Sequence, residues 1–179
     1  NHLYKKTHLV PFGEYIPFIA SLRGLITFFD LPMSNVEFGP VNQDNLTLIN
    51  QYSISTPICF DIAFPNTVRK MNKSSNFIIN ISNDTWFGAS IGPHHHLSMA
   101  RIRAIENNRW VIRATNDGFS AIISNKGTIV HKINKGEKSI LEGRIKPIKE
   151  QSFYNSYGYL LTTTFSLLFF ILSILYLSL

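Results

Sequence analysis

Short apolar runs alternate with turn-rich polar segments through the first 150 residues of the chain. Phe77–Ser82 (FIINIS) is a continuous apolar run of strand length, typical of a strand covered on both faces. Pro93–Asn108 has apolar side chains about 3.6 residues apart, and Pro65–Met71 starts with proline, so both are predicted to be helices. Six further runs are predicted to be strands: Leu46–Leu48, Tyr52–Ile58, Trp110–Thr115, Phe119–Ser124, Thr128–Ile133 and Ser139–Ile145. This order predicts an α/β domain built on layered sheets.

The segment 151–179 has a different pattern, because Glu150 is the last charged residue of the chain. Within it, Tyr157–Leu179 is apolar apart from Ser, Thr and Gly, and about 20 such residues are enough to cross a bilayer as a helix. The alternative is a buried core helix or strand, but buried helices rarely remain uncharged over this length. We therefore predict a domain over residues 1–150, then a linker and membrane-spanning helix over residues 151–179.

Composition excludes two other classes of protein. The chain has 179 residues, of which 45% are hydrophobic and 13% aromatic, which is too much apolar surface for a disordered protein. It contains one cysteine, so it is not a disulfide scaffold. Its net charge of +6 comes from scattered Lys and Arg side chains with no aromatic stacking platform among them. Membrane phospholipid headgroups are therefore the expected acidic partner, and we expect no nucleic-acid partner.

Cys59 is the first candidate for chemistry. It ends a predicted strand and is followed by Phe60 and Asp61. A thiol at a strand-to-helix transition is activated when a helix N-terminus and a nearby cation favour the thiolate. The alternative is a buried structural cysteine, a common role for this residue type.

Lys6 and Glu14 flank an apolar His-Leu-Val-Pro-Phe-Gly stretch near the start of the chain. A lysine ammonium near a nucleophile stabilises the thiolate and then the oxyanion of a tetrahedral intermediate. A carboxylate such as Glu14 would orient the ammonium. From these residues alone, an ordinary surface salt bridge is the better explanation of the pair.

The loop after Phe77–Ser82 is the third candidate, because α/β sheets place ligand sites at the carboxyl ends of their strands. Asn83 would contact a substrate there, and Trp86 and Phe87 would contact an apolar substrate or a lipid surface. The consecutive histidines 94–96 do not predict a metal site, since neighbouring helical side chains point about 100° apart. We interpret His96 as a hydrogen-bonded helix residue.

Together these segments resemble the apolipoprotein N-acyltransferase family, a membrane-bound branch of the nitrilase (carbon–nitrogen hydrolase) superfamily. The motifs that carry the resemblance are Lys6 with HLVPFGEY at 8–15, Pro57–Cys59, Ser82–Gly88, Met99–Glu106 and Arg113–Asn116. The resemblance implies a partial nitrilase-like α-β-β-α sandwich followed by one C-terminal transmembrane helix. It also implies that Cys59 is the nucleophile, Lys6 the lysine of a Glu–Lys–Cys triad and Glu14 a supporting carboxylate.

The implied reaction needs no metal and no diffusible cofactor. Cys59 would take an acyl chain from a phospholipid donor as a thioester and pass it to the N-terminal amine of a diacylglyceryl-cysteine lipoprotein. The family works at the bacterial inner membrane with its catalytic domain outside the cytoplasm. Lys and Arg near the anchor would by themselves favour the cytoplasm, but large domains translocate largely regardless of charge.

Two features depart from the family pattern. Phe60 and Asp61 stand where the family usually has Tyr and Glu, and the general-base glutamate should precede Lys6, where only Asn1–Lys5 are found. We therefore expect a C-terminal portion of a longer protein, inactive by itself unless His8 or Asp61 replaces the base. The alternatives are a nitrilase-family amidase and a non-catalytic, membrane-anchored remnant.

Overall fold

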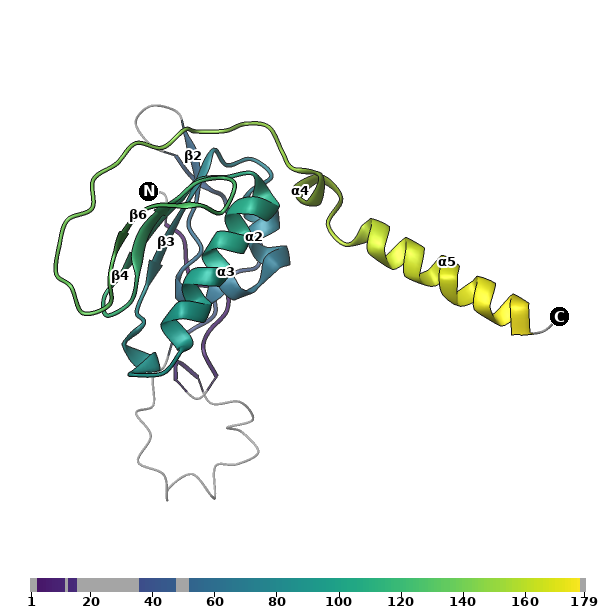
Figure 1. The fold of residues 1–179 in the computed structure, drawn as a ribbon, viewed down its shortest axis with the longest axis horizontal. Coiled ribbons are helices and arrows are strands. Elements are labelled where there is room, and N and C mark those ends of the chain that lie inside the picture. The colour runs from purple at the N-terminus through teal and green to yellow at the C-terminus, as the bar shows by residue number, and fades with distance from the viewer. Residues whose placement is uncertain (1–2, 12, 16–35, 48–51, 178–179) are drawn as a thin grey trace, which may run out of the picture.

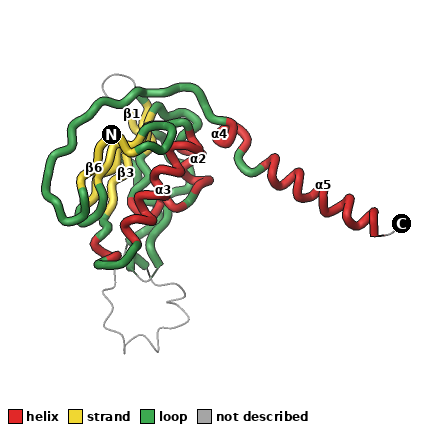
Figure 2. The backbone as a smooth tube through the Cα atoms, viewed as in Figure 1, coloured by secondary structure: helices red, strands yellow, loops and turns green. Residues whose placement is uncertain are grey.

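The computed structural model describes residues 3–11, 13–15, 36–47 and 52–177. A six-stranded mixed sheet organises them, with the strands side by side in chain order (Figures 1 and 2). The strands are β1 (Leu46–Thr47), β2 (Ser53–Ser55), β3 (Phe77–Ser82), β4 (Val111–Thr115), β5 (Ser120–Ile123) and β6 (Ile129–Ile133). The central strands β2, β3 and β4 are parallel, whereas β1, β5 and β6 pair antiparallel with their neighbours. The α/β class is therefore confirmed.

Two helices cover one face of this sheet, α2 (Pro65–Met71) and α3 (Gly92–Asn107) (Figure 1). Each begins with proline in its first turn, where the missing N–H has no intrahelical partner to lose. α3 ends at Asn107, and the next residue, Asn108, adopts the left-handed conformation common after a helix. The core between helices and sheet consists of Ile62, Val68, Ile78, Leu97, Ala100, Ala104, Val111, Phe119, Ala121 and Ile123.

The sequence prediction of a strand at Ser139–Ile145 is wrong. This segment forms no sheet pairing, and Ile140 is 86% exposed. Without buried apolar side chains, nothing offsets the entropy lost when a strand is ordered. β2 is also shorter than the predicted Tyr52–Ile58, because Pro57 has no N–H to donate to a neighbouring strand. Leu48, at the end of the first predicted strand, lies outside the described residues.

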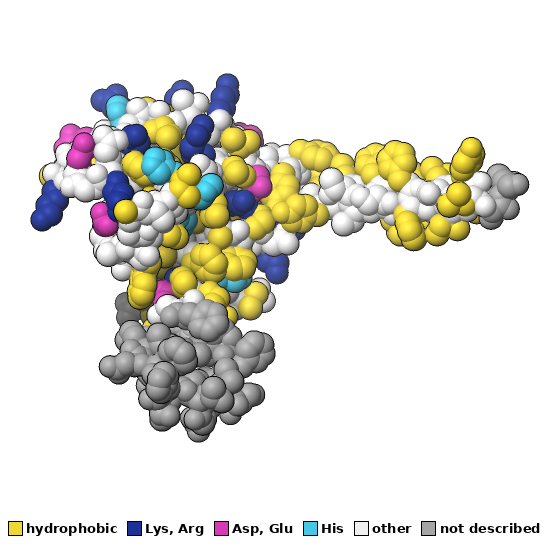
Figure 3. All heavy atoms as spheres, turned by 60° about the horizontal axis from the view of Figure 1, so that its bottom comes forward, with side chains coloured by type: hydrophobic (Ala, Val, Ile, Leu, Met, Phe, Trp, Pro, Cys, Tyr) yellow, Lys and Arg dark blue, Asp and Glu magenta, His cyan; other side chains and the backbone are white. Residues whose placement is uncertain are grey.

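The C-terminal segment leaves the domain as two helices, α4 (Phe153–Tyr157) and α5 (Leu160–Leu177). Asn155 of α4 is buried, and its Nδ2 donates to Asn107 Oδ1 of α3 at 2.8 Å. α5 projects away from the domain with apolar side chains exposed around it (Figures 1 and 3). By length and composition it is the one helix of the described residues that meets the requirements for crossing a membrane.

Candidate functional site

Cys59 lies at a sharp change of chain direction beside the end of β3. The preceding residue, Ile58, still pairs with Ile81 through a parallel bridge, and Cys59 then begins the 3₁₀ turn η2 (Cys59–Ala63). The backbone φ of Cys59 is +48°, a left-handed conformation that non-glycine residues rarely adopt. Such a conformation costs on the order of 1–3 kcal/mol and persists only where neighbouring groups enforce it.

The half-buried Cys59 thiol borders a cavity of about 570 Å³ at the carboxyl ends of the parallel strands. Its Sγ lies 3.9 Å from the backbone oxygen of Asn83. The lining combines three of the other predicted site residues with the strand ends: Glu14, Ile58, Ile81, Ser82, Asn83, Trp86, Ala114, Thr115 and Asn116. Trp86 is 63% exposed and Ile81 61% exposed, so apolar surface meets solvent beside the thiol.

Lys6 and Glu14 form a close ion pair next to this cavity. The Lys6 Nζ lies 2.5 Å from Glu14 Oε2, and the same oxygen accepts the Val10 backbone N–H at 2.8 Å. The side chain of Lys6 is only 10% exposed and that of Glu14 25%, which differs from an ordinary surface salt bridge. Glu14 therefore holds an ammonium in a partly shielded position and itself lines the cavity that contains Cys59.

Asp61 is fully buried and holds the N-terminal segment against the Cys59 turn. Its carboxylate accepts hydrogen bonds from the Tyr4 hydroxyl at 3.0 Å, the His8 backbone N–H at 2.7 Å and the Ile58 backbone N–H at 3.1 Å. Burial, with the nearby Asp61 charge, raises the pKa of Tyr4, so its hydroxyl remains a donor. Asp61 thus links the segment that carries Lys6 to the residue before Cys59.

A buried polar network lies behind the Cys59 backbone. His96 places Nε2 3.2 Å from the Cys59 carbonyl oxygen and Nδ1 2.9 Å from Asp84 Oδ1. Arg113 NH2 donates to Asp84 Oδ2 at 2.7 Å, and Arg113 also donates to Asn80 Oδ1. A Cβ at position 118 would overlap the Asp84 carboxylate, which explains the glycine there.

Asp84 is ionised within this network. Burial by itself would raise its pKa, but hydrogen bonding to His96 and the charge of Arg113 lower the value to about 2. The Arg113–Asp84 pair is inaccessible to solvent on both sides, so each charge depends on the other for compensation.

This network was not among the predictions from the sequence, in which Arg113 belonged to a motif of the family resemblance and Asp84 and Asn80 had no assigned partner. The available signal was a polar side chain within each of two apolar strands, Asn80 in FIINIS and Arg113 in VIRAT. The interpretation of His96 as a hydrogen-bonded helix residue is confirmed.

Phe87 is placed differently from the other two loop candidates. Asn83 and Trp86 line the cavity, whereas the ring of Phe87 packs edge-on against His96 with centroids 5.7 Å apart. Among the described residues, no group of three His, Cys, Asp or Glu side chains is arranged to hold a metal ion.

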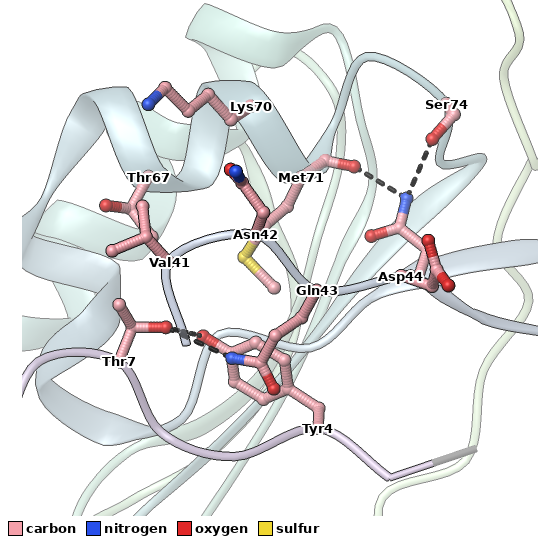
Figure 4. Close-up of a pocket in the computed structure, with 11 residues that line it drawn as sticks. Tyr4, Thr7, Val41, Asn42, Gln43, Asp44, Thr67, Lys70, Met71 and Ser74 are labelled. Atoms are coloured by element: carbon pink, nitrogen blue, oxygen red, sulfur yellow. Dashed lines mark hydrogen bonds between the residues drawn. The ribbon is translucent and has the colours of Figure 1, made fainter. Parts of the chain in front are cut away.

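A second cavity of about 310 Å³ lies between the N-terminal segment and α2. Figure 4 shows Thr67, Lys70 and Met71 of α2 facing Tyr4 and Gln43 across it. Several of its lining polar groups bond to one another: Asn45 Nδ2 donates to the backbone oxygen of Met71 at 2.7 Å, and Gln43 Nε2 donates to Thr7 Oγ1 at 3.4 Å. Of the residues described, none lines both cavities.

Comparison with known proteins gives concordant results. The carbon-nitrogen hydrolase family model matches residues 1–153. An apolipoprotein N-acyltransferase of Pseudomonas aeruginosa is 45% identical over 154 residues, which are 86% of this chain and 30% of that protein. The enzyme of the same name from Pseudomonas syringae pv. tomato is 46% identical over 151 residues, 84% of this chain and 30% of that protein. The chain thus spans about 30% of the length of these curated relatives.

Among solved structures, the NitN amidase of Nesterenkonia sp. AN1 superposes with a TM-score of 0.50 and 19% sequence identity. The match covers 74% of this chain and 47% of that one. The similarity shows a shared nitrilase-like fold with a mixed sheet.

Proposed function

Because the chain belongs to the carbon–nitrogen hydrolase family, we propose that Cys59 is the nucleophile of an acyl transfer from phospholipid to lipoprotein. The acyl acceptor is the N-terminal amine of a diacylglyceryl-cysteine lipoprotein. The similarity to apolipoprotein N-acyltransferases supports this choice of substrates over the amides of a soluble amidase.

One observation carries the proposal: Cys59 adopts a left-handed backbone at the rim of a cavity that Glu14 also lines, with Lys6 paired to Glu14. Strained backbone conformations concentrate at functional sites, because the rest of the fold must support them. Lys6 is a partly shielded cation, and a cation in a shielded site stabilises developing negative charge far better than one in water.

In the first step, the Cys59 thiolate attacks the carbonyl carbon of a phospholipid ester. A carbon–sulfur bond forms and the carbon–oxygen bond breaks, leaving a thioester and a lysophospholipid. The thiol proton passes to a general base and then to the departing lysophospholipid oxygen. By the family resemblance, that base is a glutamate that precedes the lysine in sequence.

In the second step, the lipoprotein amine attacks the thioester carbon. The carbon–nitrogen bond forms, the carbon–sulfur bond breaks, and the amine proton leaves through the base, which regenerates Cys59. Lys6 stabilises the oxyanion in both steps, with Glu14 fixing its position. Asp61 keeps the segment carrying Lys6 beside the nucleophile, and Asn83 and Trp86 form the substrate side of the loop.

We place the reaction at the bacterial inner membrane with the domain outside the cytoplasm. Both proposed substrates are lipids held in a bilayer, and α5 has the length and apolar composition of a membrane-spanning helix. Trp86 and Ile81 expose apolar surface beside Cys59, which suits an acyl chain entering from a lipid phase.

The proposal is tested with protein purified from membranes of cells that express the complete natural gene. The assay supplies phosphatidylethanolamine and a diacylglyceryl-cysteine peptide in detergent micelles, and mass spectrometry measures N-acylation of the peptide. We expect acyl transfer by the wild-type protein and none by Cys59→Ala. Hydrolysis of small amides without N-acylation would instead favour the amidase alternative, and the absence of both activities would favour the non-catalytic remnant.

A further inference from the structure

We propose that His96 is a positioning residue that presents the Cys59 thiol to the cavity through the Cys59 backbone. The inference deepens the proposed function, because it assumes that Cys59 is the reactive group. It rests on the convergence of a strained turn, a buried donor that faces the turn's carbonyl, and a fixed support behind that donor.

The donor is the His96 Nε2–H, 3.2 Å from the carbonyl oxygen of Cys59. A carbonyl oxygen only accepts hydrogen bonds, so Nε2 must carry the proton in this contact. The side chain of His96 is only 4% exposed, so water cannot readily replace it as a donor. This bond therefore acts on the peptide that immediately follows the left-handed Cys59 residue.

The support is the Arg113–Asp84 ion pair, which faces Nδ1, the other ring nitrogen of His96: Arg113 NH2 lies 3.1 Å from it and can donate to it, and Asp84 Oδ1 lies 2.9 Å from it. Asp84 is itself fixed by the Ser82 hydroxyl at 2.6 Å and by Arg113 at 2.7 Å. Groups held in place beside one ring nitrogen fix the orientation of an imidazole and so direct its other nitrogen. Phe87, packed edge-on against the same ring, limits its rotation.

The bond should therefore offset part of the free-energy cost of holding φ of Cys59 at +48°. Without it, relaxation of Cys59 toward the common conformations would turn Sγ away from its position at the cavity. The network would thus act on catalysis through the direction of the thiol, with no contact to substrate.

Thiol alkylation tests this inference without any acyl substrate, because the 179-residue chain has one cysteine. The rate constant for iodoacetamide is measured on the chain in detergent for wild type, His96→Gln and His96→Asn, with Cys59→Ser as the blank. A glutamine amide nitrogen can occupy the place of Nε2, whereas an asparagine amide nitrogen can occupy the place of Nδ1. His96→Gln thus retains the donor to Cys59, and His96→Asn retains the contact with Asp84.

We expect His96→Asn to lower the alkylation rate by about two- to tenfold, the size of one hydrogen bond, and His96→Gln to remain near wild type. A purely structural role predicts the reverse order, since Asn keeps the buried network intact. An unchanged or faster rate in His96→Asn, or an equal fall in both variants, would overturn the inference.

If a variant fails to fold, a measurement on the wild-type chain tests whether the hydrogen bond between His96 and Cys59 is present. Labelling with cysteine carrying ¹³C at its carbonyl places one probe at Cys59, and ¹⁵N-histidine labels the ring of His96. A dipolar coupling between the two at a separation of roughly 4 Å, with a protonated Nε2, is expected from the hydrogen-bond geometry. Absence of the coupling or an unprotonated Nε2 would overturn the inference. Neither measurement involves acyl transfer. The alkylation rates and the dipolar coupling can therefore be interpreted even if the N-acylation assay gives a negative result.

Discussion

The Lys6 ammonium and the Glu14 carboxylate meet at 2.5 Å beside the cavity that contains Cys59. The two residues are eight positions apart, and the Val10 N–H bonds to the same Glu14 oxygen, so the intervening chain folds back on itself. The carboxylate therefore fixes both the ammonium and the backbone that supports it. This arrangement makes the position of the Lys6 charge depend on Glu14.

Loss of the Lys6 charge should impair formation of the acyl-enzyme. In the protein expressed from the complete natural gene, Lys6→Met is expected to slow acylation of the enzyme by about 10²- to 10³-fold, the effect of removing one preorganised oxyanion donor. Glu14→Gln should slow it by about ten- to a hundredfold, because a neutral amide holds the ammonium less firmly. The measurement is the rate at which label from a radioactive phospholipid becomes bound to protein.

Lys5→Met is the matched control, because Lys5 is the exposed neighbour of Lys6. The Lys5→Met protein should form the acyl-enzyme at the wild-type rate. A fall in Lys5→Met equal to that in Lys6→Met would show that only the general charge of the segment matters.

Asp61 should control whether the N-terminal segment stays docked. Asp61→Ala leaves the Tyr4 hydroxyl and the His8 and Ile58 backbone N–H groups without their acceptor. Each buried donor left unsatisfied costs about 1–3 kcal/mol. We expect limited trypsin digestion to cut after Lys5 and Lys6 markedly faster in Asp61→Ala than in wild type.

Asp44→Ala, at an exposed carboxylate, is the control and should be cut at the wild-type rate. Equal protection of the segment in Asp61→Ala would mean that other contacts hold it.

The Asp84 carboxylate should make the stability of the domain depend on acid. Its pKa falls from 3.8 to about 2 on folding, so its contribution is complete above about pH 4 and disappears as the pH falls toward 2. The difference corresponds to about 2 kcal/mol. Wild-type chain should therefore lose stability between these pH values, relative to Asp84→Asn, in thermal unfolding followed by circular dichroism.

At neutral pH, Asp84→Asn should be the less stable of the two because it leaves Arg113 buried without its counter-charge. Asp117→Asn is the control, since that carboxylate pairs with Lys135 at the surface. The thermal stability of Asp117→Asn should depend on pH as that of wild type does. Parallel stability–pH profiles for wild type and Asp84→Asn would contradict the lowered pKa of Asp84.

Much of the fold could be predicted from local pattern. The strand Phe77–Ser82 and the helix Pro65–Met71 have the predicted bounds, because an apolar run and a proline start are signals carried by adjacent residues. The prediction failed at Ser139–Ile145, where a β-compatible sequence found no strand to pair with. Pairing depends on neighbours distant in sequence, which local pattern does not describe.

For the candidate site too, some residues could be predicted from the sequence, whereas their long-range partners could not. The family resemblance made Cys59, Lys6 and Glu14 candidates, and Cys59 and Glu14 line one cavity. The contacts of Asp61 with residues 53 and 57 positions away, and the meeting of Asp84 with Arg113, depend on tertiary structure. Such long-range partners could not be assigned from a single sequence.

The α5 helix is predicted to insert into the bilayer. Carbonate extraction of membranes from cells expressing the chain should leave it in the pellet. Phe169→Arg combined with Leu172→Arg should shift it toward the soluble fraction, because each arginine near the helix centre opposes insertion by about 2.5–3.5 kcal/mol. The control replaces the same positions by Phe169→Leu and Leu172→Phe, which should remain in the pellet. Recovery of the wild-type chain in the soluble fraction would reject the membrane-spanning role.

The identity of the residue that carries the acyl group tests the central claim most directly. The protein expressed from the complete natural gene is incubated with a phospholipid whose acyl chain is isotopically labelled. The reaction is quenched in acid, and the protein is digested and analysed by mass spectrometry. The account predicts the acyl mass on the peptide containing Cys59, its release by neutral hydroxylamine as expected for a thioester, and its loss in Cys59→Ser. An acyl group on a different residue, or undiminished labelling of Cys59→Ser, would contradict it.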